Sequence, residues 1–198
     1  MDPGNCDGCE DASHFHVGRK GSRADEAKFM FVLNRQNSSV RQGSLGLADI
    51  DNWTAAWLTT HTGANLSQAM KHAGITLDDV LVTNALKCLF PHCIIPPQED
   101  YERCKQKYFD KQFAEFGPRK MIVFGAEAYY MLFPDEYRDW DVRNDRFQPI
   151  VKNTREYHEV PVLVMNHPSA PYWRGLEYRE EMGELMKTFL ESKKPRKP

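Results

Sequence analysis

The sequence lacks any hydrophobic run long enough to cross a membrane, and it has no marked excess of either charge. Its apolar runs, such as Val160–Met165, are far shorter than the ~20 residues that a membrane-spanning helix needs. The 26 Lys and Arg residues face 28 Asp and Glu residues, for a formal charge of −2. No global positive field therefore indicates a nucleic-acid partner, and any such contact would depend on local patches. Residues 1–10 are acidic without an apolar stretch, so we expect no signal peptide and a soluble, cytoplasmic protein.

What remains is an ordinary globular composition. Of the 198 residues, 41% are hydrophobic, 12% aromatic and 27% charged, which excludes collagen-like, coiled-coil and wholly disordered chains. This length suffices for one hydrophobic core. We therefore expect a single domain over residues 1–198, with a polar, turn-rich arm at residues 1–25 and a short basic tail at residues 193–198.

Five cysteines are an odd number, which argues against a secreted disulfide framework. In a reducing compartment, a cluster of cysteines more often binds a metal. Cys6 and Cys9 form a C-x-x-C pair, Cys88 and Cys104 form a second pair with fifteen residues between them, and Cys93 lies within that gap. Four thiolates suit zinc and an iron–sulfur cluster equally well, whereas a C-x-x-C alone is also a redox motif. On spacing alone, zinc, iron–sulfur and no metal at all remain open.

Apolar runs alternate with amphipathic segments along the chain. The runs predict buried strands over residues 28–33, 80–83, 120–125 and 160–165, and Pro161 indicates an edge or the start of a strand. Helical spacing and end signals predict helices over residues 65–73, 98–116, 126–133 and 176–192. We therefore expect an α/β domain with a central four-stranded, mostly parallel sheet and helices on both faces.

Function in such sheets collects at the carboxyl ends of the strands. The first predicted strand leads to Asn34 and Arg35, the second to Asn84, and the fourth to His167. An asparagine after a strand is usually a turn or a helix cap, and a His-Pro pair is usually a rigid turn. Neutral hydrogen-bonding groups without a carboxylate are nevertheless suited to binding the edge of a neutral planar ligand.

The order of motifs resembles the uracil-DNA glycosylase superfamily, most closely its iron–sulfur branch of the family 4 type. The resemblance extends from Cys6 to about residue 190. The motifs that carry it are Cys6-Asp7-Gly8-Cys9, Val82-Thr83-Asn84-Ala85-Leu86-Lys87-Cys88, Cys104, Val123-Phe124-Gly125-Ala126 and His167-Pro168-Ser169. It implies a [4Fe–4S] cluster on Cys6, Cys9, Cys88 and Cys104, with zinc as the runner-up. Cys93 has no counterpart and is by default a free thiol.

Two motifs depart from that branch. Where the branch has G-E-x-P-G, this chain has Leu33-Asn34-Arg35-Gln36-Asn37, so the carboxylate, both glycines and the proline are missing. Superfamily members with an asparagine at the acidic position remain active. Leu58 stands where the branch has its base-stacking phenylalanine, and Trp53, Trp57 and His61 are candidates to replace it. A longer segment, residues 43–56, precedes this stretch.

The resemblance implies a DNA glycosylase that flips a uracil or a modified pyrimidine out of DNA and hydrolyses its glycosidic bond. His167 would donate a hydrogen bond to the leaving base, and Asn34 would hold the attacking water or pack against the sugar. Asn84 would bind the base edge, with Leu58, Trp57 and Arg35 contributing to recognition. The loop with Tyr172, Trp173 and Arg174 would wedge into the duplex, or else form a shielded aromatic turn.

We expect DNA as the partner and a monomer as the oligomeric state. The alternative function is a glycosylase-derived DNA-binding protein that has lost hydrolysis together with its carboxylate and glycines. The altered motifs also predict poor activity on plain uracil and better activity on a pyrimidine with an enlarged 5-substituent.

Overall fold

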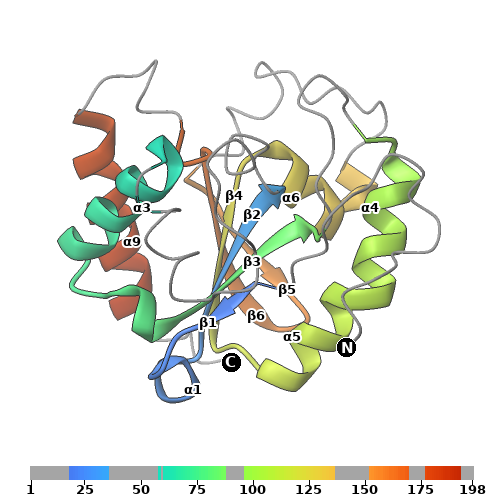
Figure 1. Ribbon diagram of the computed structural model, residues 1–198, viewed down its shortest axis with the longest axis horizontal. Coiled ribbons are helices and arrows are strands. Elements are labelled where there is room, and N and C mark those ends of the chain that lie inside the picture. The colour runs from blue at the N-terminus through green and yellow to red at the C-terminus, as the bar shows by residue number, and fades with distance from the viewer. Residues whose placement is uncertain are drawn as a thin grey trace, which may run out of the picture.

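A mixed sheet forms the centre of the computed structural model, which describes residues 18–35, 58, 60–87, 96–136, 152–169 and 177–192 (Figure 1). Six strands within these ranges follow the order β1-β3-β2-β4-β6-β5. They are β1 (Arg19–Lys20), β2 (Phe29–Arg35), β3 (Val80–Leu86), β4 (Lys120–Phe124), β5 (Thr154–Tyr157) and β6 (Val160–Met165). The four inner strands are parallel, and β1 and β5 pair antiparallel at the two edges. The α/β class and the parallel sheet are confirmed, but the predicted number of strands was too low.

Helices cover both faces of the sheet (Figure 1). The described helices are α1 (Ala24–Ala27), α3 (His61–His72), α4 (Gln98–Cys104), α5 (Asp110–Phe116), α6 (Ala126–Leu132) and α9 (Glu177–Glu191). A π-helical segment, η3 (Lys105–Phe109), joins α4 to α5, and short 3-10 turns occur at η2 (Leu77–Asp79) and η4 (Pro134–Glu136). The pair α3 and α9 lies on one face, and α4, α5 and α6 lie on the other. None of the helices in the described ranges is long and apolar enough to cross a membrane.

The pleat of β2 explains why its sequence is continuously hydrophobic. Met30 and Val32 belong to the core beneath α4, α5 and α6, whereas Phe31 and Leu33 belong to the core beneath α3 and α9. All four side chains are buried, since successive residues of a strand point to opposite faces. A parallel strand covered on both faces therefore reads as one apolar run.

The two edge strands were not predicted, because neither has the apolar run that indicates a buried strand. β1 is only two charged residues long, and β5 has no continuous apolar run. The turn between β5 and β6 places His158 and Glu159 at φ values of 45° and 65°. Such two-residue turns normally contain Asn-Gly or Asp-Gly, so the usual hairpin signal is absent here. Pro161 is the second residue of β6, as the strand-start interpretation requires.

The strand order creates a switch point at β2. From β2 the chain moves to β3 on one side of it, and later to β4 on the other side. Ligands of open α/β sheets bind beyond the carboxyl ends of the strands at such a point. The topology therefore predicts that a ligand site lies beside the residues that end β2, β3 and β6.

Candidate active site at the carboxyl ends of the parallel strands

The sheet register brings the predicted polar residues to one edge. Leu33 of β2 pairs with Asn84 of β3, so Asn34 lies next to that pair. The N–H of Gly125, just after β4, donates to the oxygen of Met165 at the end of β6, at 2.8 Å. The residues after these four strands therefore lie side by side, and Asn34, Asn84 and His167 share this edge, each partly exposed.

The His167 ring is held in one tautomer. Its Nδ1 lies 2.9 Å from the Ser169 hydroxyl and accepts a longer hydrogen bond from the Ser169 N–H, at 3.4 Å. A ring nitrogen that accepts from a backbone N–H carries no proton, so the proton of neutral His167 is on Nε2. Burial lowers the pKa of His167 to about 4. The ring is therefore neutral near pH 7, with Nε2–H available as a donor.

The turn that carries His167 is fixed by residues that the sequence analysis did not single out. Asn65, buried on α3, donates from Nδ2 to the Pro168 oxygen at 2.9 Å. Asn166, also buried, donates to the Tyr178 hydroxyl on α9 at 2.7 Å. The sequence offered one signal for Asn65, which lies beside the apolar stripe of a predicted helix. A buried amide there needs a hydrogen-bond partner elsewhere in the fold.

Asn84 is anchored through its backbone. The ammonium of Lys87 donates to the Asn84 oxygen at 2.7 Å and to the Gln112 Oε1 at 3.1 Å, and it also bonds the Thr83 hydroxyl. Lys87 is fully buried, and burial lowers its pKa to about 8, although the nearby Cys104 raises it. Thr83 bonds Gln112 of α5, so the pleat directs the Asn84 side chain toward the opposite face, which α3 and α9 cover.

Asn34 caps the neighbouring helix. Its Oδ1 accepts from the N–H of Ala128, at the third position of α6, at 3.1 Å. The cap residue of α6 is Gly125, which has no side chain, so the asparagine of β2 supplies the missing acceptor. A Cβ at Gly125 would lie 2.6 Å from the Asn34 Oδ1, and Gly125 has a φ of 89°. Both facts explain the glycine of the Val123-Phe124-Gly125-Ala126 motif.

Arg35 points its guanidinium at α6 as well. Its Nε lies 3.5 Å from the carboxylate of Glu127, which also accepts a hydrogen bond from Tyr101. The predicted contact between Arg35 and the base stays a prediction. Leu58 is 36% exposed, and its predicted contact with the base also stays a prediction. Trp53 and Trp57 lie outside the described residues.

One of the four predicted cluster ligands can be examined in its surroundings. Cys104 is buried at the end of α4, and its Sγ accepts a hydrogen bond from the Lys87 N–H at 3.4 Å. The backbone that leads into Cys88 therefore lies against Cys104, and an N–H donor to sulfur is typical of cluster thiolates. This arrangement fits a thiolate-bound group. Within the ranges that the structure describes, no three metal-binding side chains gather, and Cys6, Cys9 and Cys88 lie outside those ranges.

Cys93 also lies outside the described residues, and so do the predicted wedge residues Tyr172, Trp173 and Arg174. Their assignments stay predictions.

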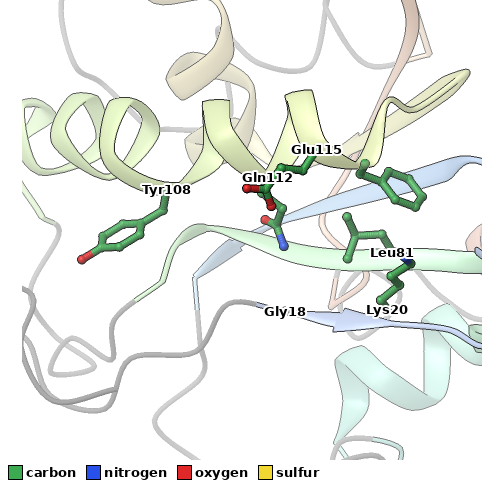
Figure 2. A pocket seen from close by; sticks show the side chains of 7 residues that line it. Gly18, Lys20, Leu81, Tyr108, Gln112 and Glu115 are labelled. Atoms are coloured by element: carbon green, nitrogen blue, oxygen red, sulfur yellow. The ribbon is translucent and has the colours of Figure 1, made fainter. Parts of the chain in front are cut away.

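A cavity of about 290 Å³ lies between β1, β3 and α5 (Figure 2). It is lined by Gly18, Lys20, Leu81, Tyr108, Gln112, Glu115 and Phe116. Figure 2 shows Tyr108, Gln112 and Glu115 along the helical side, with Leu81 opposite them on the strand. The cavity lies on the face of α5, whereas Asn84 faces α3 and α9. It is therefore separate from the site at the strand ends.

The fold and the site together define an α/β protein with neutral hydrogen-bonding groups at the switch point of a parallel sheet. A sequence model of the Uracil DNA glycosylase superfamily matches residues 15–189. The chain belongs to this superfamily.

Two curated relatives are both named Type-4 uracil-DNA glycosylase. The protein of Archaeoglobus fulgidus is 26% identical over 119 residues, covering 60% of this chain and 59% of the relative. The protein of Pyrobaculum aerophilum is 27% identical over 128 residues, covering 61% of this chain and 62% of the relative. The chain thus spans about three fifths of the length of these relatives.

Proposed function

We propose that this protein is a DNA glycosylase that flips out and excises uracil or a modified pyrimidine. The single observation that carries the proposal is the state of His167. It lies at the carboxyl edge of the sheet as a neutral ring whose proton is on Nε2. A neutral donor suits a reaction in which negative charge develops on a departing base.

The other groups at this edge have roles that fit the same reaction. The side-chain amide of Asn84 offers both a donor and an acceptor, the pattern needed to bind the carbonyl and imide N–H of a pyrimidine edge. A base with a different hydrogen-bonding edge would leave one of these groups unpaired, which is a strong source of discrimination.

Asn34 is the proposed partner of the attacking water. One lone pair of its Oδ1 is engaged by the Ala128 N–H, and a carbonyl oxygen has a second lone pair for a water. As a neutral amide, it orients the water rather than accepting its proton. Cleavage is therefore expected to depend mainly on stabilisation of the leaving base.

We propose a [4Fe–4S] cluster on Cys6, Cys9, Cys88 and Cys104, with zinc as the alternative. The fit rests on the buried Cys104 thiol and on the Lys87 N–H that reaches its sulfur. When bound, the group would cross-link residues 6–9 to the segment from 88 to 104. It would take no part in the cleavage of the glycosidic bond. DNA is the proposed partner, with Tyr172, Trp173 and Arg174 as the wedge.

The experiment that tests the function is a panel of oligonucleotides with different pyrimidine lesions, followed by alkaline cleavage of abasic sites. The proposal predicts strand breaks at one or more lesion positions and a large loss of breaks in His167→Ala. The alternative, a DNA-binding protein without hydrolysis, predicts retention of the oligonucleotides in a binding assay and no breaks at any lesion.

A further inference from the structure

Two consecutive residues at the end of β2 bind the first turn of α6. Asn34 accepts from the Ala128 N–H at 3.1 Å, and the Arg35 Nε lies 3.5 Å from the Glu127 Oε2. The same Oε2 accepts from the Tyr101 hydroxyl on α4 at 2.5 Å. One carboxylate thus joins the end of β2, the middle of α4 and the first turn of α6.

The burial of this group makes it a strong constraint. The Glu127 and Tyr101 side chains are largely buried, and the Arg35 side chain is 22% exposed. A buried carboxylate is costly without a charged or hydrogen-bonding partner, so breaking either contact is penalised. Burial and the carboxylate of Glu127 both raise the pKa of Tyr101, which keeps its hydroxyl protonated as a donor.

We propose that Glu127 is a positioning residue which, through Arg35, fixes the end of β2 and so holds the Asn34 amide at the candidate active site. The motif at this strand end lacks the glycines and proline that would define the backbone path in the branch it resembles. In this chain two side chains fix the backbone path instead, because Asn34 and Arg35 each bind a residue of α6. Glu127 acts only through Arg35 and contacts neither base nor water.

The catalytic consequence rests on the proposed glycosylase function, but the positioning itself does not. Displacement of a group that orients a reactant lowers the rate even where binding is unaffected, by up to about 100-fold for shifts near 1 Å. Loss of Glu127 should therefore lower the maximal single-turnover rate about 10-fold or more. The DNA concentration for half-maximal rate should stay the same or fall, because the Arg35 charge is no longer compensated.

The test combines a nuclear magnetic resonance measurement on the free protein with single-turnover kinetics. The variants are Glu127→Gln, which keeps the shape and an acceptor for Tyr101, Arg35→Met, and the double variant. Met186→Ala, on the buried face of α9, is the control for a general loss of stability. The Asn34 side-chain amide signals are identified by their loss in Asn34→Asp.

We expect the Asn34 amide signals to shift, and the Ala128 N–H to exchange at least 10-fold faster, in both single variants but not in Met186→Ala. The double variant should be no slower in base release than either single variant, because the two residues act as one unit. Arg35→Lys should restore part of the rate. Unchanged Asn34 and Ala128 signals in Glu127→Gln would overturn the proposal. If the unaltered protein released no base at all, the proposed function would fail while shifted signals would still support the positioning.

Discussion

The amide of Asn65 on α3 donates to the backbone oxygen of Pro168, 103 residues further along the chain, at 2.9 Å. This bond connects the buried face of α3 to the turn that carries His167. It restricts where the His167 ring can lie relative to the sheet edge. The helix therefore has a part in the site although it contributes no predicted catalytic group.

Asn65→Leu should lower both stability and the rate of base release. The substitution leaves the Pro168 oxygen without its buried donor, at a cost of roughly 1–3 kcal/mol in the free energy of unfolding. Thermal denaturation and single-turnover kinetics measure the two effects. Lys71→Ala, on the exposed side of the same helix, is the control and should change neither. A stable Asn65→Leu with full rate would show that the turn needs no support from α3.

The depressed pKa of His167 predicts a pH dependence of stability. Its folded pKa is about 4, against an ordinary value of 6.5, so the unfolded chain binds more protons between these values. The contribution of His167 to stability is therefore complete above pH 6.5 and is lost progressively as the pH falls toward 4. Urea denaturation at several pH values measures the free energy of unfolding. This free energy should depend less steeply on pH in His167→Asn than in the wild type. An equally steep pH dependence in both proteins would contradict a lowered pKa of His167 in the folded protein.

Asn34 should contribute to both stability and rate, but less to the rate than His167 does. Asn34→Ala removes the cap of α6 and should cost about 1 kcal/mol, whereas Asn34→Asp keeps an acceptor at the helix N-terminus and should cost less. The rate loss in Asn34→Ala should be smaller than the ~10²–10³-fold loss expected for His167→Ala. Denaturation midpoints and single-turnover rates test both statements. An inactive Asn34→Ala beside an active His167→Ala would reverse the proposed roles.

The proposed cluster ligands predict that iron content depends on Cys104 but not on Cys93. Cys104→Ser should lower iron content and stability together, because metal ligation would connect the predicted N-terminal arm to the Cys88–Cys104 segment. Cys93→Ser should leave iron content and absorbance near 400 nm unchanged. Elemental analysis and visible spectroscopy provide the readouts. Stoichiometric zinc without iron in the wild type would contradict the cluster assignment.

The parallel core of the fold was predictable because each inner strand is buried on both faces. The apolar run of Val160–Met165 matches β6 exactly as the structure bounds it, and the run at residues 28–33 lies within one residue of the start of β2. The start of α3 was placed four residues late, at Asn65 rather than His61. The reason is that Thr60, whose hydroxyl accepts from the Gly63 N–H at 3.0 Å, begins the helix before its apolar stripe starts.

The site was predictable only where a motif marks a strand end. Asn34, Asn84 and His167 follow strands, so the topology brings them to one edge. Asn65 and Glu127 carry no such mark, because their roles depend on partners 103 and 92 positions away, Pro168 and Arg35. Contacts of that range arise from helix packing, which local sequence patterns do not encode.

The most direct test of the central claim is to detect the free base released from DNA. Single-turnover reactions with matched oligonucleotides, containing uracil or a 5-hydroxymethyl or glycosylated pyrimidine, are analysed by mass spectrometry for free base. The account predicts that the wild type releases a pyrimidine, faster when its 5-substituent is enlarged, because the pocket lacks the usual glycines and stacking phenylalanine. It also predicts a ~10²–10³-fold slower release by His167→Ala. DNA binding without any released base would contradict the claim, and robust release of uracil alone would contradict the account of the pocket.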